Sequence, residues 1–314
     1  MDPITLLQQL IQVNSVNGNE RAVVQIIQSY LADAGIDAHF VETTPGRDNL
    51  IAEIGSGHPL LAWTGHADVV SAEPVASWAQ PPFAGLIQAD TIYGRGSVDM
   101  KGGLAAMTVA LATLHRNHFA GHIRFIVTVG EEYGAPGSRQ LTQAGVVDDI
   151  DALVVGEPTD HHIEYAHAGS FNYKVHSQGL AGHSSRPELA KNAIEPLADF
   201  IVRERHLFDD APTDPVIGAL VHSVTVINGG AQVNTIPDTA SLAGNVRPTP
   251  SFTNQMVTER LQSLVDSLNK ETDSELTFEL THSFFPVYTE PTDPLVQIAQ
   301  LVAEKAFDQR IPLT

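Results

Sequence analysis

The sequence predicts an α/β protein: a mostly parallel sheet covered by helices, with an inserted α+β module built on an antiparallel sheet. Helical patterns separate near-continuous apolar runs in the first half of the chain, which is typical of a parallel sheet covered on both faces. The apolar runs are residues 50–54, 60–63, 123–129 and 152–155, and the helical patterns include 103–114 and 138–144. Near residue 168 the pattern changes to alternating apolar and polar residues, as at 171–177. Such alternation favours an antiparallel sheet with one exposed face.

Two helices are expected before the first strand. Asp2 precedes Pro3, which suits the first helical position, and apolar residues follow at helical spacing. A second helix is predicted from about residue 19 to 34, ending at Gly35.

The inserted module has its own elements and boundaries. Strands are predicted at 223–227, 239–246 and 276–280, and helices at 192–205 and 254–268. A further helix at 294–307 is interpreted as a return to the first domain. We therefore expect one domain made of residues 1–168 and 283–314, and an inserted domain of residues 169–282.

Composition excludes several classes of partner and chemistry. The 314 residues hold 17 Lys plus Arg against 37 Asp plus Glu, a formal charge of -20, which disfavours binding to nucleic acids or anionic membranes. The absence of cysteine excludes disulfides and thiolate ligands. No secretion leader or bilayer-spanning apolar run is recognised, so a cytoplasmic location is expected.

Acidic and imidazole side chains follow the predicted strands of the first domain. They are His66 and Asp68 after strand 60–63, Glu131 and Glu132 after strand 123–129, and Glu157 after strand 152–155. Asp99 lies in a glycine-rich loop just before a helix. Because the carboxyl ends of parallel strands form one ligand-binding edge, the residues after the strands are expected to converge. Asp99 is the exception, although a carboxylate in its loop could reach the same edge.

One imidazole with several carboxylates suits zinc, manganese or cobalt. Two metals sharing a carboxylate would activate water and polarise an amide carbonyl, while adjacent glutamates could serve as ligand and base. Each residue also has a simpler interpretation: a hydrogen-bonded surface His66, a solvated turn at Glu131 and Glu132, a helix cap at Asp99, and a strand exit at Glu157. Their common placement at strand ends favours the site.

Four ordered motifs carry a family resemblance. They are TGHADVV at 64–70, GRGSVDMKGG at 94–103, GEEYG at 130–134 and GEPT at 156–159. In order, spacing and identity they resemble the metallopeptidase family that contains acetylornithine deacetylase, succinyl-diaminopimelate desuccinylase, aminoacylase and carboxypeptidase G. The resemblance extends over nearly the whole chain.

The resemblance implies a role for each residue of the predicted centre. His66 and Glu157 would bind one metal and Glu132 the other, with Asp99 bridging both. Asp68 would bond to the second ring nitrogen of His66 and orient it. Glu131 would be the general base, taking a proton from the attacking water and delivering it to the leaving amine.

In this family the inserted module is a lid that also forms a homodimer. The segment GLAGHSSRP at 179–187 resembles the lid motif, which implies that His183 reaches the partner subunit's site and stabilises the oxyanion. Arg247 in GNVR resembles the arginine that holds the substrate carboxylate, and Asn234 in VNTIP would supply another hydrogen bond. The simpler interpretations are a solvated loop histidine and a surface cation.

One expected ligand of the second metal has no counterpart in the sequence. The family places a histidine in a glycine-rich segment near its C-terminus, and His282, at the lid boundary, does not match that motif. Either the sequence is a fragment of a longer protein or the second metal site is incomplete. The set of His66, Asp99 and Glu157 is intact.

The predicted activity is metal-dependent hydrolysis of a small N-acylated amino acid or peptide, most like the desuccinylases and deacetylases of amino-acid biosynthesis. Two metals are expected, zinc first, with cobalt or manganese as alternatives. An aminopeptidase or dipeptidase is the neighbouring alternative, and a catalytically silent metal-binding scaffold is the alternative from another class. The presence of Glu131, which has no purpose in a purely structural site, argues against the scaffold.

Overall fold

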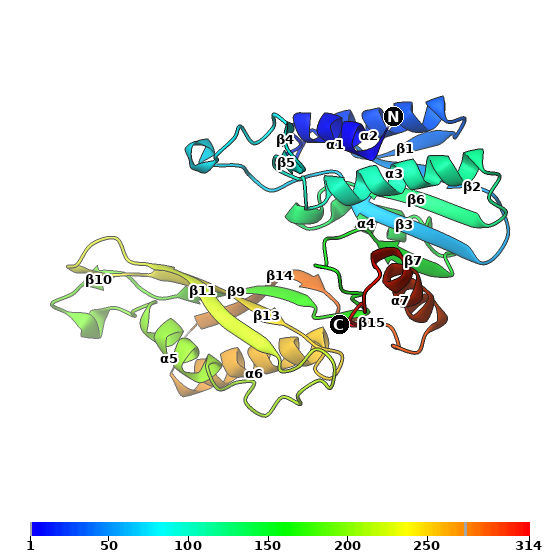
Figure 1. The fold of residues 1–314 in the computed structure, drawn as a ribbon. Helices are drawn as coiled ribbons and strands as arrows, with labels where there is room; N and C mark the ends of the chain where they lie inside the picture. The colour runs from blue at the N-terminus through cyan, green and yellow to red at the C-terminus, as the bar shows by residue number, and fades with distance from the viewer. Residues whose placement is uncertain (1, 273–274) are drawn as a thin grey trace. The chain divides into compact units, whose positions relative to one another are not determined.

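The computed structural model describes residues 2–272 and 275–314 of the chain. Contacts divide the chain into two compact units, Met1–Asp160 and His161–Thr314 (Figure 1). Among the described residues, no helix is both long and apolar enough to cross a lipid bilayer.

The first unit contains four helices and seven strands in its described part. The helices are α1 (Pro3–Gln12), α2 (Glu20–Asp33), α3 (Lys101–Arg116) and α4 (Pro136–Gln143), and the short turns are η1 (Val75–Ser77) and η2 (Glu131–Tyr133). The strands are β1 (Ala38–Thr44), β2 (Arg47–Ile54), β3 (Leu60–His66), β4 (Leu86–Gln88), β5 (Thr91–Tyr93), β6 (His122–Thr128) and β7 (Ala152–Val155). As predicted, α1 begins after Asp2, whose carboxylate accepts the backbone N–H groups of Ile4 and Thr5.

The main sheet of the first unit is mixed, so the prediction of a mostly parallel sheet is confirmed in part: β2 alone runs against the other four strands. Its order is β1-β2-β6-β3-β7, with β3 parallel to both β6 and β7, and β2 antiparallel to both β1 and β6. Only Pro45 and Gly46 separate β1 from β2, and so short a connection allows an antiparallel pair alone. Strand β1 was missed from the sequence, and with it the antiparallel pair that it forms with β2.

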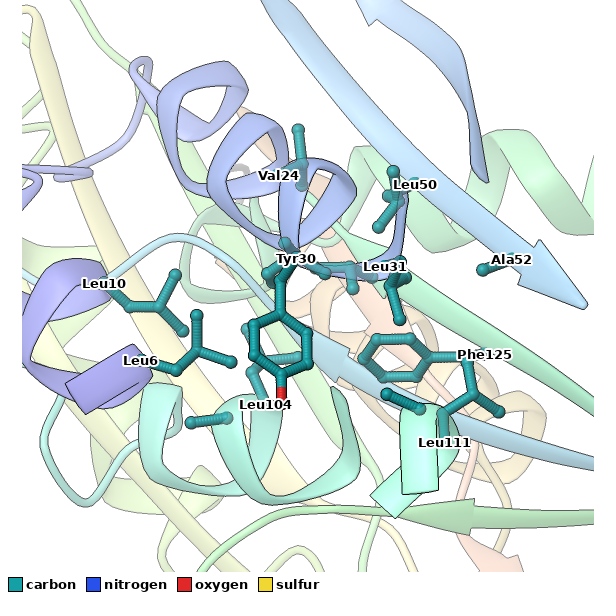
Figure 2. Packing of buried hydrophobic residues seen from close by; sticks show 14 of the residues in the cluster. Leu6, Leu10, Val24, Tyr30, Leu31, Leu50, Ala52, Leu104, Leu111 and Phe125 are labelled. Carbon is teal, nitrogen blue, oxygen red and sulfur yellow. The ribbon is translucent and has the colours of Figure 1, made fainter. Parts of the chain in front are cut away.

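Helices cover both faces of this sheet. On one face α1, α2 and α3 pack their buried apolar residues against β2 and β6, as Figure 2 shows for Leu10, Leu31, Leu104 and Phe125. On the other face Leu141 of α4 packs against Ile51 and Ile126. The α/β class is therefore as predicted, and the covered sheet gives its carboxyl edge a rigid base.

The second unit is built around an antiparallel sheet of order β11-β13-β9-β14. These strands are β9 (Ser170–Gln178), β11 (Val221–Gly229), β13 (Thr239–Arg247) and β14 (Glu275–Phe284); α5 (Glu195–Glu204) and α6 (Asn254–Glu271) share its apolar core. The other elements are β8 (Ala166–His167), β10 (Gly182–His183), η3 (Pro187–Leu189), β12 (Thr235–Ile236), β15 (Val287–Tyr288) and α7 (Pro294–Phe307).

The segments that flank this sheet pair with each other. Strand β15 pairs with β8, and Ile163 forms a parallel bridge with Leu313. These contacts join residues 161–168 to residues 283–314. Both ranges were predicted to belong to the first domain, whereas the contacts place both in the second unit. The domain boundaries stay a prediction.

Candidate metal centre

Three strand ends carry most of the predicted centre. His66 is the last residue of β3, Glu131 and Glu132 open η2 just after β6, and Glu157 follows β7. Because β6, β3 and β7 run parallel and adjacent, their carboxyl ends lie at one edge of the sheet. His66, Glu131, Glu132 and Glu157 therefore share the edge at which the sequence predicts them.

A glycine contact brings Asp99 to the same edge. Asp99 lies at the end of the glycine-rich loop before α3, and a Cβ atom on Gly103 in the first turn of that helix would clash with the backbone oxygen of Gly156. Only glycine permits this approach of α3 to the chain before Glu157. Close packing at Gly103 therefore places the loop of Asp99 beside the end of β7.

His66 lies at the middle of the cluster and is almost fully buried. Its Nε2 is 3.1 Å from Oδ1 of Asp99 and 3.3 Å from Oε1 of Glu157. Burial alone would favour the neutral ring, but the carboxylates of Asp68 and Glu157 outweigh it and raise the pKa of His66 to about 11. The site therefore favours positive charge at this position, which a divalent cation would supply in place of the proton.

The donor atoms fit a divalent metal. His66, Asp99 and Glu132 each offer a ligand atom, and these atoms all lie within 4.8 Å of one another. A tetrahedral zinc about 2.0–2.1 Å from each ligand separates its donors by roughly 3.3 Å. The 3.1 and 3.3 Å distances from His66 to Asp99 and Glu157 match that spacing.

Asp68 is fully buried and links His66 to the two glutamates. Its Oδ1 accepts the backbone N–H of Glu131 at 3.0 Å, and its Oδ2 accepts that of Glu132 at 3.1 Å. Burial would raise the pKa of Asp68, but the imidazole of His66 and these two N–H groups lower it below the ordinary value. The carboxylate thus anchors the turn that presents both glutamates.

The contact between Asp68 and His66 differs in detail from the expectation. Nδ1 of His66 lies 3.0 Å from the backbone oxygen of Asp68 and 3.6 Å from its carboxylate Oδ1. At 3.6 Å the carboxylate is too far for a hydrogen bond. In this structure the backbone oxygen orients the ring, while the carboxylate is committed to η2.

Glu131 stands beside the ligand cluster. Partial desolvation of its carboxyl group raises the pKa of Glu131, and the nearby carboxylates of Glu157, Asp68 and Asp99 raise it further. Desolvation of its carboxyl group also raises the pKa of Glu132, and the carboxylates of Asp99, Glu131 and Asp68 raise it further. A carboxylate with a raised pKa is a better proton acceptor near neutral pH.

Buried polar side chains on β2 and α2 were not predicted as part of the region around η2. The side chain of Asn49 is buried; its Oδ1 accepts the backbone N–H of Val129 at 3.1 Å and its Nδ2 donates to the oxygen of Gly137 at 3.2 Å. Arg47 forms an ion pair with the buried Glu20. These contacts join residues about 30 to 90 positions apart, so no local spacing in the sequence reveals them.

The three predicted lid residues lie in the second unit. Nδ1 of His183 is 2.8 Å from Oγ of Ser185, and His183 pairs with Thr235, next to Asn234. His183 on β10 and Asn234, just before β12, lie near the end of the four-stranded sheet at which β13 begins (Figure 1). Arg247 is the last residue of β13. All three are exposed. The structure therefore brings His183 and Asn234 together and places Arg247 at the opposite end of the strand.

The covered sheet and its edge of carboxylates around one imidazole define a metal-binding α/β protein equipped for hydrolysis. A model of the peptidase family M20/M25/M40 matches residues 62–314. The chain belongs to this family, and it is a metal-dependent hydrolase.

Similar proteins support this assignment. The chain is 33% identical over 335 residues to a probable succinyl-diaminopimelate desuccinylase from Staphylococcus aureus, covering 98% of this chain and 82% of that protein. It is 31% identical over 319 residues to a succinyl-diaminopimelate desuccinylase from Parvibaculum lavamentivorans, covering 97% and 79%. The fold matches an M20-family metallo-carboxypeptidase from Sulfolobus solfataricus with a TM-score of 0.79 and 18% identity, covering 100% and 85%.

Proposed function

We propose that the chain removes an N-acyl group from a small amino acid, with an N-succinyl-amino acid as the first candidate substrate and an N-acetyl-amino acid as the second. The observation that carries this proposal is the placement of Glu131, a carboxylate with a raised pKa, on the turn that also presents the ligand Glu132. The names of the relatives at 31–33% identity favour the succinyl group.

We propose the following division of labour. His66, Asp99, Glu157 and Glu132 would hold zinc, or else cobalt or manganese. The bound metal would supply Lewis acidity that polarises the scissile carbonyl and favours ionisation of water. Glu131 accepts the proton of the attacking water and returns it to the leaving nitrogen. Asp68 keeps Glu131 and Glu132 at fixed positions through their backbone N–H groups.

The substrate contacts proposed for the second unit require two copies of the chain. From its first residue to Arg247, β13 spans eight residue steps, about 27 Å at roughly 3.4 Å each. His183 and Asn234 leave the sheet at the far end, so a small substrate held by Arg247 is out of their reach within one protomer. We therefore propose a homodimer in which His183 and Asn234 of the partner complete each site.

Strand β11 offers a surface for this dimer. It forms one edge of the four-stranded sheet, and Val226 and Ile227 on it are about half exposed. An unpaired edge with exposed apolar residues is a template for pairing with another chain. This supports dimerisation through the second unit.

A substrate panel tests the function. Protein stripped of metal and reloaded with zinc, cobalt or manganese is assayed on N-succinyl-amino acids, N-acetyl-amino acids and dipeptides, with Glu131→Gln as the matched inactive control. The proposal expects the highest kcat/KM on an N-succinyl substrate. Replacing Arg247 should lower kcat/KM for that substrate, but should have little effect on an analogue whose α-carboxylate is replaced by a carboxamide. Preference for dipeptides would favour the peptidase alternative, and no hydrolysis of any of these substrates with any of the three metals would overturn the proposal.

A further inference from the structure

The chain that follows α1 contacts the loop that carries His66. Ser15 is fully buried; its Oγ donates to the backbone oxygen of Ala67 at 2.8 Å, and its own oxygen accepts the N–H of Val69 at 3.2 Å. Val16 forms a parallel bridge with Val69. Residues 15–16 therefore hold the backbone on both sides of Asp68, directly after His66.

The same segment is tied to the loop that carries Asp99. Lys101, two residues beyond Asp99, is fully buried, and its Nζ donates to the backbone oxygens of Leu10 at 2.8 Å and Val13 at 2.9 Å. These carbonyls belong to the last turn of α1 and its C-cap, and the oxygen of Leu10 also accepts the backbone N–H of Val13 at 3.2 Å. The end of α1 is thus bonded to the start of α3.

Gly96 lies where the two loops meet. A Cβ atom there would stand 2.8 Å from Cγ1 of Val69 and 3.0 Å from Cδ of Lys101. The backbone N–H of Lys101 also donates to the oxygen of Gly96 at 3.0 Å. Three segments, residues 13–16, 67–69 and 96–101, are therefore packed and hydrogen-bonded together beneath the centre.

Core packing alone does not account for a lysine at this position. Taking an ammonium group out of water costs several kcal/mol, and an apolar side chain of similar volume would fill the same space more cheaply. The acceptors of Lys101 are two neutral carbonyls. What an apolar residue could not supply is the pair of hydrogen bonds to the backbone oxygens of Leu10 and Val13.

We propose that Ser15 and Lys101 are positioning residues of the metal centre, joined through residues 13–16 into a brace that fixes the distance between His66 and Asp99. The inference rests on the metal centre of the proposed function. Neither residue contacts the donor atoms; each acts through the backbone that carries them. Loss of the brace lets the two loops separate, which weakens metal binding before it unfolds the unit.

Cobalt binding tests the brace without an activity assay. Metal-free protein is titrated with Co²⁺ alone, and the dissociation constant and the visible d–d absorption bands are recorded for wild type, Ser15→Ala and Lys101→Met. The matched control is Thr108→Val, which removes a fully buried hydroxyl of α3; among the described residues this hydroxyl donates to the backbone oxygen of Leu104, within its own helix. The brace predicts that Ser15→Ala and Lys101→Met bind Co²⁺ about 10- to 100-fold more weakly with shifted bands, as for lost partners of metal ligands. Thr108→Val should stay within about threefold of wild type.

The opposite result is equally clear. Folded Ser15→Ala and Lys101→Met proteins with wild-type Co²⁺ affinity and bands would overturn the brace, whatever stability they lose. Should Lys101→Met not fold, Ser15→Ala decides the question by the same criteria. His66→Ala and Asp99→Asn in the same titration separate the two proposals: if they too bind Co²⁺ as wild type does, the metal centre itself is overturned, and the brace with it.

Discussion

Replacing Asp68 by asparagine should weaken both the metal centre and the fold of the first unit. The carboxylate now accepts two backbone N–H groups, those of Glu131 and Glu132, with separate oxygens. Asparagine keeps one oxygen and presents an NH₂ group where the other stood, so one buried N–H faces a donor. The turn that carries Glu131, the proposed base, and Glu132, the proposed ligand, then loses one of its two anchors.

The size of the effect follows from these contacts. A lost hydrogen bond to a charged group, with its partner left buried, costs about 2–4 kcal/mol. Removing one negative charge also relieves repulsion with the neighbouring glutamates, for which we allow about 1 kcal/mol. We expect a net loss of about 2 kcal/mol in the free energy of unfolding without metal, and a 10- to 100-fold loss of metal affinity.

Urea denaturation and zinc titration of Asp68→Asn measure both quantities. The two tryptophans, Trp63 and Trp78, lie in the first unit, so their fluorescence reports its unfolding. Asp214→Asn is the matched control, because the Asp214 carboxylate also accepts two successive backbone N–H groups, from Val216 and Ile217, but in the second unit. Equal zinc affinity in Asp68→Asn and wild type, or an equal loss in Asp214→Asn, would refute the reasoning.

Three further predictions concern the dimer, pH and packing. Mixing inactive His183→Ala with inactive Glu131→Ala should restore part of the activity, because a heterodimer contains one site with both residues; no recovery in proven heterodimers would exclude action across the interface. Hydrogen bonds from the N–H groups of Ile217 and Val216 hold the pKa of Asp214 below its ordinary value of 3.8. The carboxylate of Asp214 therefore stabilises the fold above pH 3.8, and this stabilisation is lost as pH falls through the lowered pKa. The difference in free energy of unfolding between wild type and Asp214→Asn should become smaller from pH 7 to pH 3. A difference that stays constant would contradict this. Gly244→Ala, whose new methyl group would collide with the buried ring of Tyr173, should cost about 1–3 kcal/mol in urea denaturation, and an unchanged midpoint would show that the ring can move.

Local signals were sufficient for most elements. The cap at Asp2, the stop at Gly35 and the apolar runs of β2, β3, β6 and β7 each act over a few residues, and the structure has helices and strands at those places. The convergence of His66 with Glu157 followed from one topological rule about parallel strand ends, and the distance agrees with it. Asp99 lies in a loop outside that rule, and close packing at Gly103 brings it to the same edge.

Long-range contacts could not be predicted in the same way. Strand β1 is half-buried and polar in part, so its run carries no strong periodicity, and with it the mixed character of the sheet was missed. The bonds of the Asp68 carboxylate to η2 depend on a turn more than 60 residues away. Lys101 lies inside a recognised motif, yet it donates to the backbone oxygens of Leu10 and Val13. Every residue has a backbone oxygen, so the sequence does not show which residues accept these bonds.

The central claim is that Glu131 acts on protons while its neighbour Glu132 binds metal, and a comparison of two variants tests it most directly. Zinc content after gel filtration and turnover of the best substrate are measured for Glu131→Gln and Glu132→Gln alongside wild type. The account predicts that Glu131→Gln keeps its zinc and loses turnover by at least about 100-fold, as expected for a missing general base, whereas Glu132→Gln loses zinc. Zinc loss in Glu131→Gln equal to that in Glu132→Gln, or turnover within about fivefold of wild type, would contradict it.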